Sequence, residues 1–281
     1  MQAPGDSVAQ ESESLNILNI QTGQVRSSNQ FLALCLLGLL LWGVIPPTQA
    51  QDLRIVHCFA GCPIGADEDN HLILRSIYAL SYNTEIKTAE WAAYQVTAGS
   101  VGIASSLSRQ PVADNYVADT LSVEDFAQAG EIGLLRAQYV PLVNFAGTPY
   151  WQEVNYLTNA VARSNSLSQG AWYGLEWATR NLVNRQQVLF VLTGPIFNPE
   201  SEALHLPVSA EHRVPDGFFK IVITPEGKSA AFQFQQDNSV GMHHCNLQTT
   251  VAELEQLTGL QFFPELNRSL DESLSEDLGC F

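Results

Sequence analysis

Residues 168–182 read SQGAWYGLEWATRNL, and their pattern predicts the central helix of the protein. Trp172, Leu175 and Leu182 recur at helical spacing, so their side chains fall near one apolar face. Ser168, at the start of the run, is a residue type that caps helix N-termini. Glu176 and Arg180 are separated by one helical turn. The stretch therefore combines a core-facing stripe with charged side chains.

Several segments on either side of this helix predict strands. Residues 91–96 (WAAYQV) and 188–193 (VLFVLT) are typical of strands, and we expect Gly194 and Pro195 to end the second. Residues 218–224 and 230–235 predict a hairpin, whereas residues 72–79 fit a strand or a short helix equally well. A second helix is expected at 250–259, with Thr250 and Glu253 as a capping box and Gly259 at its end. Strands with separate helices, without regular βαβ units, predict an α+β fold with a mixed or antiparallel sheet core.

The composition of the 281 residues limits the class of protein. There are 13 Lys and Arg against 29 Asp and Glu, giving a formal net charge of -16. This excludes a histone-like binder that relies on a broad positive field. The hydrophobic fraction of 46% excludes a mainly disordered chain.

The first fifty residues predict export. Residues 31–45 (FLALCLLGLLLWGVI) carry no charge, follow Arg26 and precede the small residue Ala50. This order matches a secretory signal cleaved near Ala50, which would leave a secreted or periplasmic protein without stable membrane association. A retained membrane anchor is the alternative, although the apolar run is shorter than the roughly 20 residues of a spanning helix. We divide the chain into a leader with signal (1–50), a main domain (51–264) and an acidic tail (265–281).

Four cysteines follow the leader: Cys58, Cys62, Cys245 and Cys280. An even number in an exported chain predicts two disulfides. Cys58–Cys62 would close a local loop, and Cys245–Cys280 would tie the tail, expected as an exposed appendage, to the main domain. The alternative is a metal site, for example one formed by Cys245 with the adjacent histidines at 243 and 244.

Short segments along the chain follow one another in the order known from one protein family. They are CFAGCPIG (58–65), YALSYN (78–83), TAEWAAY (88–94), NYLTN (155–159), LSQGAW (167–172), TGP (193–195), VPDGFFK (214–220) and TVAELEQLTG (250–259). Together they resemble the secreted DNA/RNA non-specific endonucleases. The resemblance implies a ββα-metal finger within the α+β fold and metal-dependent hydrolysis of phosphodiesters in DNA and RNA.

The resemblance also implies which positions form the site. In the family a His takes a proton from the attacking water, an Asn holds Mg²⁺, a Glu orients the water around the metal, and Arg side chains brace the phosphate. The family's Asp-Arg-Gly-His matches residues 135–138 here, so Arg136 is kept and Gln138 stands at the position of the base. Ser168 stands at the position of the metal-binding Asn, and Glu176 is kept. Arg109 and Arg180 match the other phosphate-binding arginines.

These two departures leave two classes of function open. The first is an endonuclease with weak activity and weakened Mg²⁺ binding, in which Asn165 is a candidate replacement ligand. The second is a catalytically inactive relative that binds nucleic acid or a protein partner. The arginines either bind phosphate or pair with acids such as Glu176. The resemblance further implies a homodimer.

Overall fold

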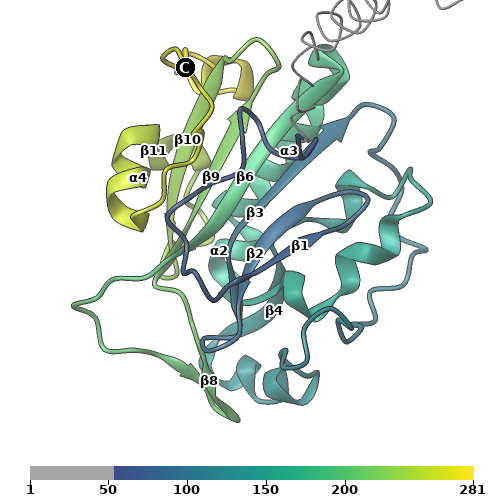
Figure 1. The fold of residues 1–281 in the computed structure, drawn as a ribbon, viewed down its shortest axis with the longest axis vertical. Coiled ribbons are helices and arrows are strands. Elements are labelled where there is room, and N and C mark those ends of the chain that lie inside the picture. Colours follow the sequence, from purple (N-terminus) through teal and green to yellow (C-terminus); the bar gives the residue numbers. More distant parts are fainter. Residues whose placement is uncertain (1–53) are drawn as a thin grey trace, which may run out of the picture. The chain divides into compact units, whose positions relative to one another are not determined.

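The computed structural model describes residues 54–281, so the predicted leader and signal lie outside the described residues. A seven-stranded sheet forms the centre, with strand order β1-β2-β3-β6-β9-β10-β11 (Figure 1). Its strands are β1 (His71–Leu74), β2 (Ala79–Asn83), β3 (Thr88–Thr97), β6 (Val188–Ile196), β9 (Gly217–Ile223), β10 (Ser229–Gln235) and β11 (Gln248–Thr249). All neighbouring strands in it are antiparallel. The predicted α+β fold with an antiparallel sheet core is confirmed.

Residues 54–281 also contain two smaller sheets and three α-helices. The small sheets pair β4 (Leu134–Gln138) with β5 (Ala160–Ser164), and β7 (His205–Leu206) with β8 (Ser209–Arg213). The helices are α2 (Asn165–Gln169), α3 (Ala171–Gln186) and α4 (Val251–Thr258). Short 3-10 helices are η1 (Glu124–Phe126), η2 (Ala129–Ile132), η3 (Leu142–Asn144), η4 (Trp151–Asn155), η5 (Leu157–Asn159), η6 (His244–Leu247) and η7 (Glu276–Leu278). The order β4, β5, α2 and α3 supplies the ββα unit that the resemblance implies.

The strand predictions hold with one correction. The hairpin prediction is confirmed by β9 and β10, and residues 72–79 form β1, a turn and the start of β2. Gly194 and Pro195 do not end β6, which continues to Ile196. β3 pairs with β6 only as far as Thr193, so the missing N–H of Pro195 breaks no bond between these strands. A side chain at Gly194 would collide with the carbonyl oxygen of Glu90.

The predicted central helix begins differently from the expectation. Ser168 is not an N-cap, because it lies inside the short helix α2, which Ser164 caps by accepting a hydrogen bond from Leu167 N (3.2 Å). The chain bends at Gly170, and α3 starts at the next residue. A Cβ at Gly170 would lie 2.7 Å from the carbonyl oxygen of Val240, so this bend requires glycine. The hydroxyl of Ser168 is therefore available to side chains.

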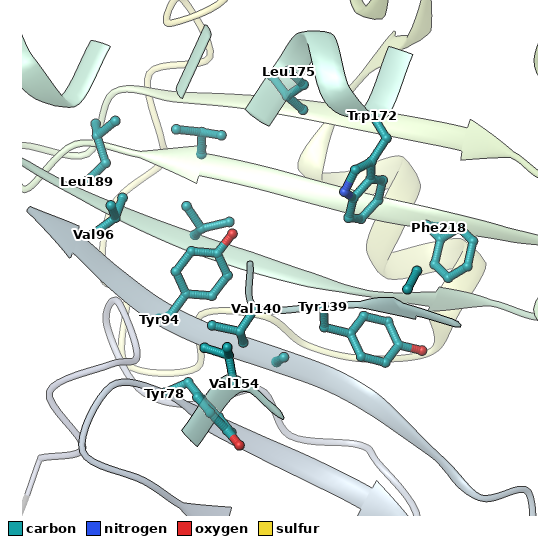
Figure 2. Packing of buried hydrophobic residues seen from close by; sticks show 14 of the residues in the cluster. Tyr78, Tyr94, Val96, Tyr139, Val140, Val154, Trp172, Leu175, Leu189 and Phe218 are labelled. Carbon is teal, nitrogen blue, oxygen red and sulfur yellow. The ribbon is translucent and has the colours of Figure 1, made fainter. Parts of the chain in front are cut away.

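The core lies on both faces of the large sheet. On one face, α3 packs Trp172 and Leu175 against a cluster that contains Phe218 and Val222 of β9 (Figure 2). Phe219, Ile221 and Ile223 of β9 point to the other face, where they meet the buried side of α4. Because β9 is covered on both faces, all of its side chains are buried.

The helix predicted at 250–259 is confirmed as α4. Thr250 Oγ accepts from Glu253 N (3.2 Å), the Glu253 carboxylate accepts from Thr250 N (3.0 Å), and Gly259 ends the helix in the left-handed conformation. The residue types that predicted both ends thus make the expected contacts.

Both predicted disulfides are present, Cys58–Cys62 and Cys245–Cys280. The tail is not an exposed appendage, because Leu274 and Leu278 are buried in the core cluster on the α3 side. Their apolar side chains fix the tail in addition to the disulfide. No helix of the described residues is long and apolar enough to cross a membrane.

Candidate active site

The elements of the ββα unit, which are β4, β5, α2 and α3, line a pocket of about 320 Å³. It brings together all six site residues predicted from the resemblance. They are Arg109, Arg136, Gln138, Ser168, Glu176 and Arg180. β4 carries Arg136 and Gln138, α2 carries Ser168, and α3 carries Glu176 and Arg180. Arg109 comes from the segment between β3 and η1, and the pocket also includes Arg163 of β5, which was not among the predicted site residues.

Arg163 is the buried cation of this pocket. Its Nε donates to Ser168 Oγ at 3.0 Å, and its guanidinium lies 4.0 Å from the centre of the Trp172 ring. Burial lowers the pKa of Arg163 to about 10, and the nearby Glu176 carboxylate opposes this shift. The side chain therefore remains charged at neutral pH. The hydroxyl of Ser168, which the resemblance matches to the metal-binding Asn, thus accepts from a guanidinium of the same chain.

Glu176 is held by two further cations. Its Oε1 accepts from Lys220 Nζ, and its Oε2 lies 3.4 Å from Arg180 Nη1. Lys220 also lies over the Trp172 ring, with 3.9 Å between Nζ and the ring centre. Burial lowers the pKa of Lys220 to about 8, so its ammonium form still dominates at neutral pH. The predicted pairing of arginines with acids thus holds for Arg180.

Gln138 is oriented by the backbone. Its Nε2 donates to the carbonyl oxygen of Val154 at 2.7 Å. A side-chain amide does not titrate near neutral pH, so this group can orient a water molecule but cannot take its proton.

Arg109 and Arg136 are the cations left without an acidic partner. Arg136 Nη2 donates to the carbonyl oxygen of Arg109 at 3.0 Å. Among the described residues, no carboxylate oxygen lies within 4.0 Å of either guanidinium. Burial lowers the pKa of Arg136 from its usual range. A guanidinium remains charged in proteins at neutral pH. These two side chains remain available to an anionic ligand.

The oxygen donors of the pocket do not fit a divalent cation. Mg²⁺ binds oxygen ligands in near-octahedral geometry, usually through one or two carboxylates. Here Ser168 Oγ accepts from Arg163, and both oxygens of Glu176 face cations. A divalent ion among them would meet the positive charges of Arg163, Arg180 and Lys220 against one carboxylate. Asn165, the candidate replacement ligand, is not among the residues that line the pocket.

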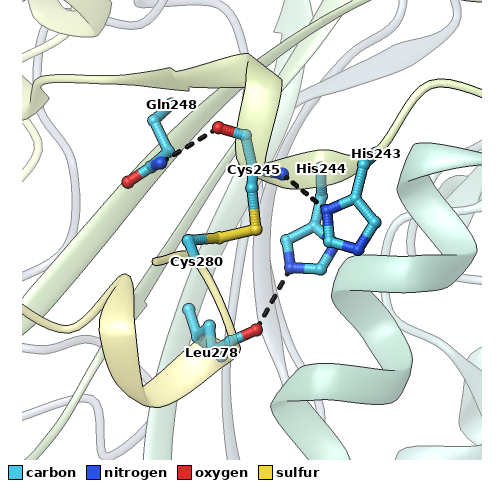
Figure 3. Close-up of a disulfide and its surroundings, with 6 residues drawn as sticks. All are labelled: His243, His244, Cys245, Gln248, Leu278 and Cys280. Carbon is cyan, nitrogen blue, oxygen red and sulfur yellow. Dashed lines mark hydrogen bonds between the residues drawn. A yellow bond between two sulfur atoms is a disulfide. The ribbon is translucent and has the colours of Figure 1, made fainter.

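The alternative metal site near the second disulfide is also not supported. Cys245 is bonded to Cys280, so its sulfur is not a thiolate ligand (Figure 3). The His244 ring nitrogen Nε2 lies 3.2 Å from the carbonyl oxygen of Leu278, and His243 Nδ1 accepts from Cys245 N. Both histidines therefore have structural contacts in the segment that the disulfide fixes.

The sequence contains a signal for the two buried cations Lys220 and Arg163. Lys220 stands alone within the apolar strand sequence FFKIVIT, and Arg163 stands within AVARS. A charged residue inside a buried strand requires a partner, since an unpaired buried charge is very costly. The partner of Lys220 cannot be identified from neighbouring residues, because it comes from α3, which is distant from β9 in the sequence.

Comparisons with known proteins agree with this geometry. Residues 61–269 match the family model described as DNA/RNA non-specific endonuclease. A nuclease of Serratia marcescens is 31% identical over 265 residues, covering 91% of this chain and 96% of its own length. A nuclease of Nostoc sp. is 26% identical, covering 82% and 89%. A solved structure of an EndoG/EndoGI complex, at 22% identity, has the same fold with a TM-score of 0.63 over 75% of this chain and 89% of that one. The chain belongs to the DNA/RNA non-specific endonuclease family.

Proposed function

We propose that this protein binds the phosphodiester backbone of nucleic acid in its arginine-lined pocket, and that metal-dependent hydrolysis there is weak or lost. The observation that carries the proposal is the hydrogen bond from buried Arg163 to Ser168. The guanidinium of Arg163 lies beside Ser168, the residue that the resemblance matches to the family's metal ligand. In this proposal, its positive charge attracts the phosphate where a bound metal ion would otherwise do so.

Loss of hydrolysis follows from the chemistry of two side chains. Nucleases of this family are typically metal-dependent, and the pocket's oxygen donors are engaged by cations of the chain. Gln138 cannot act as a general base, a role worth about 10²–10⁴-fold in rate. Both changes act in the same direction, so we expect Mg²⁺ binding to be weak and the rate to be low.

Retention of nucleic-acid binding follows from the local charge. The pocket and its ion-pair network combine five cations with one acid: Arg109, Arg136, Arg163, Arg180 and Lys220 with Glu176. The chain as a whole carries a formal charge of -16, so this pocket is a local positive site on an acidic protein. Arginine guanidinium groups bind phosphate oxygens through paired N–H donors. DNA and RNA share this backbone, and both are therefore ligands of the proposed site.

The place of action is part of the same proposal. We infer that residues 31–45 direct the chain out of the cytoplasm, with cleavage near Ala50. The two disulfides support a secreted or periplasmic location, because such bonds persist in oxidising compartments. Retention by the apolar segment as an anchor is the alternative, and N-terminal sequencing of the exported protein distinguishes the two.

The proposal is tested by measuring binding and cleavage on the same oxidised protein. Labelled DNA and RNA are incubated with a chelator, and we expect retarded complexes that Arg136→Ala weakens about tenfold or more, the value of a charged hydrogen bond. Arg54→Ala serves as the matched control, because Arg54 is exposed and pairs with Glu265 outside the pocket. Supercoiled plasmid with Mg²⁺ or Mn²⁺ should remain intact. Robust nicking that the chelator abolishes would contradict the proposal.

The residual scaffold can be probed by restoring two family residues and removing one cation. Gln138→His restores the base, Ser168→Asn restores the metal ligand, and Arg163→Gln removes the guanidinium that donates to position 168. Plasmid nicking by this variant would confirm that these positions form the active site. Tight binding without nicking would place the defect elsewhere in the pocket.

A further inference from the structure

Two large aromatic side chains lie exposed on α3 beside the arginine pocket. Tyr173 and Trp177 are each 58% exposed, and Tyr173 also lines the pocket. They are four residues apart on a helix, so their side chains lie on one face about one turn, or 6 Å, from each other. Arg180 follows Trp177 by three residues and lines the same pocket. We call Tyr173 and Trp177 the aromatic ridge.

The aromatic ridge is not needed to hold α3 on the sheet. That task belongs to the neighbouring Trp172 and Leu175, which are buried against the core. Trp91 is likewise buried, with 2% exposure, which is the usual environment of a large aromatic side chain. Two such side chains kept in solvent next to a cationic pocket point to a ligand that offers both flat apolar faces and negative charge.

We propose that the aromatic ridge stacks the bases of an unpaired nucleic-acid strand whose phosphate lies in the arginine pocket, and that it selects single strands over duplexes. This inference rests on the proposed function. Sites for single strands combine a positive groove along the backbone with aromatic side chains that stack on successive bases. A duplex hides the faces of its bases, so it can use the arginines but not the ridge.

Charge argues against a second copy of this chain as the occupant. In a twofold contact between copies, the pocket beside each ridge would bring its excess of arginines toward that of the other copy, and like charges repel. A single strand instead brings phosphates to Arg109 and Arg136, which have no acidic partner within 4.0 Å among the described residues.

The test compares two ligands and two kinds of variant. Fluorescence anisotropy with a chelator and fixed salt measures binding of a labelled oligothymidylate of about 12 nucleotides, within the range of known single-strand sites, and of a duplex of the same length. We expect tighter binding of the single strand. Tyr173→Ala and Trp177→Ala should each weaken it about 5- to 150-fold, the range for one stacked base. Trp177 is not among the residues that line the pocket, so Trp177→Ala should leave duplex binding unchanged. Phe281→Ala is the control, since Phe281 is a fully exposed aromatic residue outside the pocket.

Tryptophan fluorescence reports stacking directly. Trp91 and Trp172 are buried, whereas Trp177 is exposed. The oligothymidylate should therefore quench part of the tryptophan emission in the wild-type protein, and Trp177→Phe should remove that part of the quenching.

The outcomes separate this inference from the proposed function. Equal affinity for the two ligands, or unchanged single-strand affinity in Trp177→Ala, would overturn the inference that the aromatic ridge stacks bases. In that case Arg136→Ala still tests whether the pocket binds the phosphate backbone. If the wild-type protein binds neither ligand, both proposals fall. A change from dimer to monomer in Trp177→Ala, seen by size-exclusion chromatography with light scattering, would instead identify the ridge as a contact between copies and overturn the inference.

Discussion

The two faces of the large sheet differ in what they bury. Toward α4, β9 presents Phe219, Ile221 and Ile223, which join an apolar cluster. Toward α3, the same strand presents Lys220 between Phe218 and Val222, and Lys220 meets Glu176 of the helix. Apolar side chains of similar volume would often stabilise such a position at least as well as a buried ion pair. The α4 face therefore serves stability, and the charges kept on the α3 face indicate a binding site.

The largest effect that distinguishes the faces is expected for Glu176→Ala. This change leaves buried Lys220 without its carboxylate partner, and breaking a buried ion pair by removing one partner costs about 3–5 kcal/mol. Denaturant unfolding measures the loss. The matched change on the other helix is Glu255→Ala, which removes one hydrogen bond to Phe262 N and should cost about 1 kcal/mol. Equal losses would show that the ion-pair network does not distinguish the faces.

The disulfides provide the second comparison, because each lies on a different face. Cys245 and Cys280 pack against the cluster on the α3 side, and Cys58 and Cys62 against the cluster on the α4 side. Their sequence separations are 35 and 4 residues. The entropy of loop closure predicts losses of about 4 kcal/mol and about 2 kcal/mol when each pair is replaced by serine. Thermal unfolding of the two double variants checks the order, and a larger loss from the short loop would reverse it.

The third prediction concerns the pH dependence of stability. His212 of β8 is a buried titratable group that contacts β5, the strand that carries Arg163. His212 Nε2 lies 3.4 Å from Ala162 N, and burial lowers the pKa of His212 from its usual 6.5 to about 4. A group with a lowered pKa in the folded state takes up a proton more readily when unfolded. Stability should therefore fall as pH drops from about 6.5 to about 4, by about 3 kcal/mol.

Unfolding by urea across this pH range, with His212→Gln as the comparison, measures that contribution. We expect a flatter profile in the variant. A wild-type profile that is already flat below pH 6.5 would contradict the assignment to His212.

Local signals predicted much of this fold. The capping box of α4 and the hairpin of β9 and β10 depend on neighbouring residues, and both were confirmed. The resemblance also selected six side chains that one pocket brings together. The contacts that give the pocket its character were not predictable in this way. Arg163 can donate to Ser168 because Ser168 lies in the separate short helix α2. Lys220 can pair with Glu176 because β9 packs against α3.

Titration with Mn²⁺, followed by electron paramagnetic resonance, measures whether an internal guanidinium has taken the place of a metal ion in this pocket. Mn²⁺ prefers the same oxygen ligands as Mg²⁺. For the wild-type protein we expect the signal of free aqueous Mn²⁺ to persist, whereas Arg163→Gln with Ser168→Asn should bind about one ion. Stoichiometric binding by the wild-type protein that Glu176→Gln abolishes would contradict the account.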